Sequence, residues 1–307
     1  MFDRIAVEPT ELASRESLST AVSAFGFQRG RILAMLPRGW AREVYDRLER
    51  LPAGPDQLAA RILLRRLTEQ AVRCGASFDI SAAWLENALR ARADRRIEGI
   101  VATQADAHEV PDIWKFVESA TSPITEMIPH TIAGFERACR RLVESAPRSV
   151  IVDPYFDIAR PRCFDVLRGL IQWGSEGRCT EYDVYCRATA VLGTDAGRLE
   201  RFDRQASDAL AKAGGPRPFR VRTFLLDDKR GDQSPMHRRA LVTEHGGIGI
   251  DYGFRIEEGR TSDVTVMAGA PLDQLIEFYY DGRHPYGEPV HFFEYSGGRS
   301  ASRPAGR

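Results

Sequence analysis

The spacing of hydrophobic and polar residues divides the chain into two parts with different predicted structures. Up to residue 129, apolar residues recur every three or four positions, which is the period of amphipathic helices. The segments with this pattern are 38–51, 56–74 and 81–96. A Pro-Ala-Gly-Pro turn at 52–55 ends the first segment, and Gly75 follows the second. We therefore expect a small helical domain at 1–129, with no catalytic motif of its own.

The pattern changes at about residue 130. A helical segment leads into 149–157, reading SVIVDPYFD, a short β-branched strand with acidic residues and a proline at its end. Helical and strand patterns then alternate, which predicts an α/β domain over 130–296 with parallel strands at its centre. The Gly, Ser, Arg and Pro residues of 297–307 offer nothing to bury, so we expect that tail to be disordered.

Composition narrows the possible partners. Basic and acidic residues number 43 each, so the formal net charge is zero and an anionic partner must be bound by a local basic patch. General coating of nucleic acid is thereby excluded. All but three of the basic residues are arginine, which fits phosphate recognition by guanidinium groups but is more simply explained by a GC-rich coding genome.

The cysteines and histidines show no metal-binding spacing. Five widely separated cysteines without a CxxC pair indicate reduced thiols in a cytosolic protein. His108 and His130 each stand alone, which is typical of a surface or helix-start histidine, and His284 and His291 lack carboxylates at ligand spacing. We expect no metal and no cofactor. Without a signal-like start or a run of about 18 apolar residues, we also expect a cytoplasmic protein with no membrane span.

The first candidate functional residue lies at the end of the first strand of the α/β domain. Ligands of α/β sheets bind beyond the carboxyl ends of strands, where Asp153 delivers a carboxylate. Asp153 could instead cap the turn that Pro154 begins.

The segment 236–254, MHRRALVTEHGGIGIDYGF, contains a sharper pattern. His237 and Arg239 are two residues apart, so on a strand both side chains point to one face. A histidine can attack or protonate a phosphodiester while a guanidinium holds its oxygens. Glu244 follows seven residues after His237, and we expect a hairpin that turns at Gly246-Gly247. The pattern predicts a phosphate site on a β-hairpin.

These features resemble a known family. The strand ending in Asp-Pro-Tyr and the downstream His-x-Arg segment are similar to the phospholipase D-like domain that follows MIT domains in eukaryotic ESCRT-linked proteins, and to proteins of bacterial conflict and defence loci. The resemblance covers about residues 130–295 and implies a phospholipase D-like mixed sheet flanked by helices. The family signature is His-x-Lys, four residues, then Asp. It implies His237 as nucleophile, Arg239 as phosphate clamp, and Asp153 and Glu244 as orienting groups.

The chain departs from the family signature in three ways. Arginine replaces the lysine, glutamate replaces the aspartate, and the Ser and Asn that usually follow are not evident in GGIGIDYGF. Arginine is not equivalent to a compact ammonium at a phosphoryl oxygen. Active members also combine two motifs, one histidine as nucleophile and the other as acid, whereas this chain has one. Turnover by that route requires a homodimer that brings two copies of His237 face to face.

Two functions follow from the resemblance. One is a phosphodiesterase or nuclease that acts on nucleic acid as an effector or accessory component of bacterial antiviral defence, which the intact His237 favours. The other is a non-catalytic scaffold that binds a phosphate-containing ligand, with a protein partner docked on the helical N-terminal region. The replacements at Arg239 and Glu244 favour the scaffold.

Overall fold

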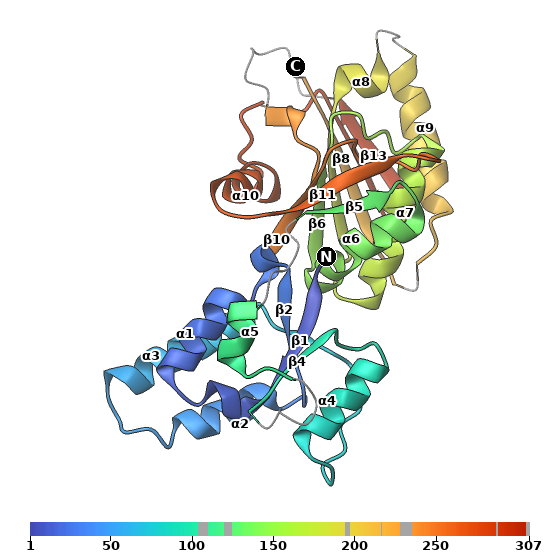
Figure 1. Cartoon of the computed structure of the whole chain (residues 1–307). Coiled ribbons are helices and arrows are strands. Elements are labelled where there is room, and N and C mark those ends of the chain that lie inside the picture. Colours follow the sequence, from blue (N-terminus) through green and yellow to red (C-terminus); the bar gives the residue numbers. More distant parts are fainter. Residues whose placement is uncertain are drawn as a thin grey trace. The chain divides into compact units, whose positions relative to one another are not determined.

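The computed structural model describes residues 1–103, 110–119, 125–193, 197–215, 217–227, 235–286 and 288–304. The chain divides into two compact units, Met1–Pro123 and Ile124–Arg307 (Figure 1). The division falls shortly before the predicted boundary at residue 129, because β5 (Thr125–Pro129) is a strand of the second unit. His108 lies outside the described residues, as does most of the polar loop before Pro235.

The first unit is an α/β unit, so the prediction of a purely helical domain is wrong. It contains a parallel sheet in the order β3-β2-β1-β4. The strands are β1 (Asp3–Val7), β2 (Arg31–Met35), β3 (Val72–Arg73) and β4 (Gly99–Val101). The helices are η1 (Pro9–Leu12), α1 (Arg15–Ala24), η2 (Phe27–Arg29), α2 (Trp40–Leu48), α3 (Pro55–Glu69), α4 (Trp84–Ala93) and α5 (Ile113–Ser119). The predicted helices at 38–51, 56–74 and 81–96 correspond to α2, α3 and α4.

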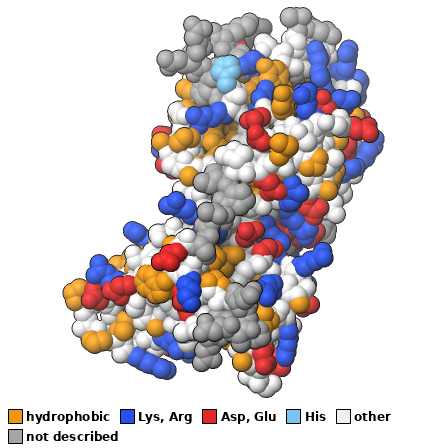
Figure 2. Space-filling view, in the orientation of Figure 1, with side chains coloured by type: hydrophobic (Ala, Val, Ile, Leu, Met, Phe, Trp, Pro, Cys, Tyr) orange, Lys and Arg blue, Asp and Glu red, His pale blue; other side chains and the backbone are white. Residues whose placement is uncertain are grey.

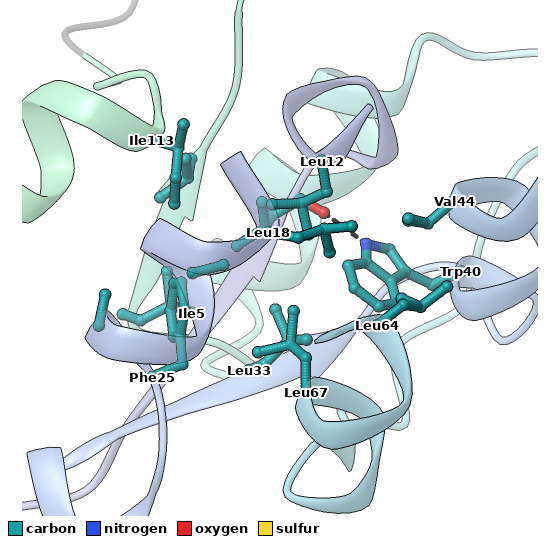
Figure 3. Close-up of a cluster of buried hydrophobic side chains, with 14 of the residues drawn as sticks. Ile5, Leu12, Leu18, Phe25, Leu33, Trp40, Val44, Leu64, Leu67 and Ile113 are labelled. Atoms are coloured by element: carbon teal, nitrogen blue, oxygen red, sulfur yellow. Dashed lines mark hydrogen bonds between the residues drawn. The ribbon is translucent and has the colours of Figure 1, made fainter. Parts of the chain in front are cut away.

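The sequence pattern did not predict the strands of this sheet because they are short apolar runs. A run such as IAV or ILAM, buried on both sides, has neither the alternation of a half-exposed strand nor the length of a helix. One side of this sheet packs on α1, α2 and α3 around the fully buried Trp40, whose indole N–H donates to Val7 O at 2.6 Å (Figure 3). Leu18, Leu33 and Leu64 close around the ring (Figure 3). This core belongs to the first unit alone.

The second unit is built on a nine-stranded mixed sheet in the order β13-β12-β8-β7-β6-β9-β10-β11-β5. Its further strands are β6 (Arg148–Val152), β7 (Glu181–Arg187), β8 (Arg220–Leu226), β9 (Ala240–Thr243), β10 (Gly246–Ile250), β11 (Thr261–Met267), β12 (His291–Ser296) and β13 (Arg299–Pro304). β6, β7 and β8 are parallel, and the other neighbours pair antiparallel. An α/β fold with parallel central strands is therefore confirmed.

Helices cover the two faces of this sheet unequally. Its helices are α6 (Ile132–Ser145), α7 (Pro161–Glu176), α8 (Ala188–Leu192), α9 (Arg198–Ala211), η3 (Pro235–His237), α10 (Ala270–Leu275) and η4 (Ile276–Tyr280). α6, α7 and α9 lie on one side, whereas α10 lies on the other (Figure 1). Leu272, Leu275 and Tyr279 bring α10 and η4 onto the apolar surface of β6 and β9.

Two details of the sequence interpretation are wrong. The segment expected to be a disordered tail forms β13 as far as Pro304, because Gly297 and Gly298, both at positive φ, turn the chain back so that Arg299 pairs with Ser296. The pattern of 179–192, CTEYDVYCRATAVL, predicts one strand, but β7 ends at Arg187 and α8 begins at Ala188.

Candidate functional site

The candidate site lies at the carboxyl ends of the parallel strands β6 and β7. Asp153 and Tyr155 directly follow β6, and Arg187 is the last residue of β7. β9 runs antiparallel to β6, with Ala240 paired to Val152, so the chain that enters β9 lies beside the chain that leaves β6. The sheet thereby brings together Asp153 and Arg239, which are far apart in sequence.

Asp153 is held rigidly and is 3% exposed. Its carboxylate accepts hydrogen bonds from the backbone N–H of Tyr155 at 2.9 Å and of Phe254 at 3.0 Å, and its Oδ1 lies 3.9 Å from Arg239 Nε. Burial raises the pKa of Asp153, while the N–H donors and the charge of Arg239 oppose that rise. Asp153 therefore caps the turn, and its carboxylate also forms an ion pair with Arg239.

Gly253 makes room for this carboxylate. Its φ is +83°, a left-handed conformation that favours glycine. A Cβ at this position would lie 3.0 Å from Arg239 Cδ and closer still to Asp153 Oδ2. The glycine therefore allows the backbone that follows β10 to approach Asp153 and donate from Phe254.

Arg239 is fixed by groups on several sides. Besides its ion pair with Asp153, it donates from Nη1 to the backbone carbonyl of Asp251. Its guanidinium carbon lies 5.4 Å from the centre of the Tyr155 ring. The side chain is 30% exposed, so part of this anchored cation faces solvent. A guanidinium that is held in place before a ligand arrives binds an oxyanion at little ordering cost.

His237 does not lie on a strand, contrary to prediction. Pro235–His237 is a short 3-10 helix, and β9 begins only at Ala240. Buried Met236, whose N–H donates to the Tyr286 hydroxyl at 2.8 Å, anchors this turn. His237 itself is exposed. The side-by-side arrangement expected from strand alternation is therefore absent.

His237 and Arg239 nevertheless line one pocket. It has a volume of about 290 Å³ and is lined by His237, Arg238, Arg239, Ala240, Gly249, Ile250, Asp251, Thr265 and Met267. Gly249 leaves the pocket open because it has no side chain, and the nearest atom to a Cβ there is Arg239 O at 3.9 Å. Three basic side chains that share one pocket with a single aspartate form an environment suited to an anion.

Glu244 lies away from this pocket. β9 separates it from Arg239, and four strand residues advance the chain by roughly 13 Å. Glu244 occurs in the hairpin turn, where its carboxylate lies 3.3 Å from His245 Nε2. The structure does not bring Glu244 to His237 or Arg239. The turn itself is Glu244-His245, because Thr243 pairs with Gly246, and the predicted turn at Gly246-Gly247 is therefore wrong.

A buried histidine contact near the site was missed by sequence reasoning. His130, expected at the surface or at the start of a helix, lies just before α6 and is fully buried. Its Nδ1 lies 2.9 Å from Arg255 O, and its Nε2 lies 2.6 Å from Ser262 Oγ. Since a carbonyl only accepts, Nδ1 carries the proton and Nε2 accepts from the serine hydroxyl. Ser262 Oγ in turn accepts from the Tyr252 N–H at 3.3 Å, so this contact fixes the segment that contains Gly253. A lone histidine before a helix gave no signal of this role.

The wider surface has no single dominant charge. On the face shown in Figure 2, basic and acidic side chains are interspersed over both units. Within the described ranges, no group of three or more His, Cys, Asp or Glu side chains is arranged to hold a metal ion. No helix in the described part of the chain is long and apolar enough to cross a membrane.

Comparisons with known proteins give little further information. No protein family matches the chain, and no curated protein matches it. Among solved structures, the archaeal chromatin protein TrmBL2, whose structure shows a novel mode of DNA binding, has 13% sequence identity over 88% of this chain and 91% of its own. Its TM-score is 0.27, a likeness that carries no argument about fold or function.

Proposed function

We propose that the second unit is a phospholipase D-like module that binds a phosphodiester in the pocket of His237, Arg238 and Arg239. The observation that carries the proposal is the anchored position of Arg239, held by buried Asp153 beside a pocket with two further basic side chains. A planar guanidinium donates in pairs to phosphate oxygens, and Arg238 and His237 add donors from the same side. The phospholipase D-like assignment rests on the sequence resemblance.

Binding without turnover in a single chain fits this geometry better than hydrolysis. The family's mechanism needs a nucleophilic histidine and a second histidine as acid, whereas His237 is the one histidine that lines the pocket among the residues described there. Glu244 is too distant to orient it. The proposed role is therefore recognition of a phosphate-containing ligand, in a bacterial defence or conflict setting, with a protein partner on the first unit.

Hydrolysis by a homodimer is the second candidate, and the exposure of His237 favours it. An exposed histidine at the mouth of a pocket can meet a copy of itself across a two-fold axis, where one supplies the nucleophile and the other the proton. Sedimentation analysis with and without a phosphodiester tests for such a dimer. Release of nitrophenol from bis-nitrophenyl phosphate, lost in His237→Ala, would establish turnover.

The binding proposal is tested with a fluorescent abasic oligomer of about ten deoxyribose phosphate units, which presents phosphodiesters without bases. Fluorescence anisotropy at low salt measures its affinity for the whole chain. We expect Arg239→Lys, which keeps the charge but removes the paired donors, to weaken binding by about tenfold. Arg238→Ala should weaken binding without disturbing Asp153, which supports the site even if position 239 tolerates no change.

Arg168→Ala is the matched control. Arg168 is an exposed arginine on α7, is paired with Asp165 at 2.8 Å, and is not among the residues that line the pocket. The Arg168→Ala variant loses one positive charge, as Arg238→Ala does, so a general electrostatic effect would weaken binding equally in the two variants. Equal effects of Arg168→Ala and Arg238→Ala would overturn the proposal.

A further inference from the structure

Tyr155 places an aromatic ring beside the proposed phosphate site, and hydrogen bonds hold the backbone that carries it. Tyr155 is 52% exposed, although the peptide group that precedes it is hydrogen-bonded at both its N–H and its carbonyl. The Tyr155 N–H donates to Asp153, and the Arg187 N–H donates to the Pro154 carbonyl at 3.1 Å. The ring is thus an exposed apolar surface with little backbone freedom, which distinguishes it from an aromatic residue on a loose loop.

Two guanidinium groups lie over the Tyr155 ring, but neither is in close stacking contact with it. The guanidinium carbon of Arg239 is 5.4 Å from the ring centre, and that of Arg187 is 5.8 Å. By contrast, Arg260 lies 4.3 Å from the centre of the Tyr252 ring, a distance at which the guanidinium covers the face. Tyr155 is therefore surrounded by positive charge but still offers ring surface to a ligand, in agreement with its exposure.

An open aromatic ring between two guanidinium groups matches one class of ligand. Successive units of a single-stranded nucleic acid carry a planar base and an anionic phosphate, and proteins that bind such strands place aromatic rings beside basic grooves. In a duplex the base faces are already stacked on one another, so they are not free to meet a ring. A phosphopeptide or a lipid headgroup supplies the phosphate but no planar base.

We propose that Tyr155 is a stacking platform for a base of single-stranded nucleic acid whose adjoining phosphate is bound by Arg239. This inference rests on the proposed phosphodiester site and names the ligand class of that site. Arg187, at the end of β7, adds a second positive charge near the ring. The pairing of stacking with a phosphate contact predicts strand binding that tolerates many base sequences.

The test compares a labelled oligothymidylate of about ten units with the abasic oligomer of equal length and with a duplex. Anisotropy titrations use the whole chain and Tyr155→Ala, Tyr155→Trp and Tyr45→Ala. Tyr45 is the matched control, because it is 42% exposed and has the Arg61 guanidinium 5.5 Å from its ring, but it lies in the first unit. All of these side chains are exposed, so the variants should fold.

We expect wild-type protein to bind oligothymidylate at least about fivefold more tightly than the abasic oligomer. Tyr155→Ala should remove that difference, so that the two strands bind alike, Tyr155→Trp should retain it, and Tyr45→Ala should have no effect. The inference is overturned if Tyr155→Ala binds oligothymidylate as tightly as wild type does, or if wild type binds the abasic oligomer as tightly as oligothymidylate. In either case the phosphate site would remain supported without a base-stacking role for Tyr155. If neither single strand binds in an Arg238-dependent way, the proposed function itself fails.

Discussion

Replacement of Gly253 by alanine tests how the candidate site is held together. The added Cβ would lie 3.0 Å from Arg239 Cδ and closer still to Asp153 Oδ2. The loop must therefore retreat, and the hydrogen bond from the Phe254 N–H to the Asp153 carboxylate is lost. The change adds no charge and removes no side chain, so its effect reports on this close approach.

The expected cost has two parts. Alanine at a φ of +83° costs about 1–2 kcal/mol, because its Cβ crowds the backbone. Loss of a hydrogen bond to a buried carboxylate adds about 1.5–3 kcal/mol. The sum of about 3–5 kcal/mol corresponds to a fall of roughly 10 °C in the unfolding midpoint of a unit of this size.

Gly259→Ala is the matched control for the backbone part. Gly259 has a φ of +73°, belongs to the same unit, and has nothing within 4 Å of an added Cβ. Calorimetry of both variants should show a fall of about 2–6 °C for Gly259→Ala and about twice that or more for Gly253→Ala. Equal falls in the unfolding midpoint would refute the reasoning, since they would show that the close approach of Gly253 to Asp153 adds no stability.

Two further predictions concern buried groups. Asp183 is 2% exposed and accepts from Arg222 Nε at 2.7 Å and Nη2 at 2.8 Å, so Asp183→Asn should lower the free energy of unfolding by about 3–5 kcal/mol in urea denaturation. Asp56→Asn, which breaks an exposed pair, should cost less than about 1 kcal/mol, and similar costs for the two would contradict this account. Burial raises the pKa of Cys163 to about 11, so at pH 8 only about one thiol in a thousand is ionised there. Mass spectrometry should find Cys163 unalkylated by iodoacetamide in native protein at pH 8 and alkylated in urea, and native labelling would contradict the burial.

The fold was predictable where the sequence carries a clear period. Helices α2, α3 and α4 and the strand β6 were expected, because helical spacing and a β-branched run are properties of the local sequence. The strands β1 and β2 were not, since their short apolar runs owe their conformation to neighbours on either side of the sheet. β13 was also missed, because its few apolar residues gave no reason to expect a partner in β12.

Part of the candidate site was also predictable from local sequence patterns. Asp153 was named from its place at the end of a strand and Arg239 from the His-x-Arg spacing, and the antiparallel pairing of β6 with β9 brings the two together. Glu244 was assigned by spacing alone, yet an intervening extended strand carries it to the other end of the hairpin. The role of Gly253 was not predicted, because it depends on a contact between segments about a hundred residues apart.

The turn that carries Tyr155 also bears on the kinetics of binding. The ring stands in place before any ligand arrives, because Asp153 and the end of β7 already fix the backbone on both sides. A strand therefore meets a surface that needs no rearrangement, and encounter is governed by diffusion and charge. Loss of the ring should leave the association rate nearly unchanged and shorten the lifetime of the complex.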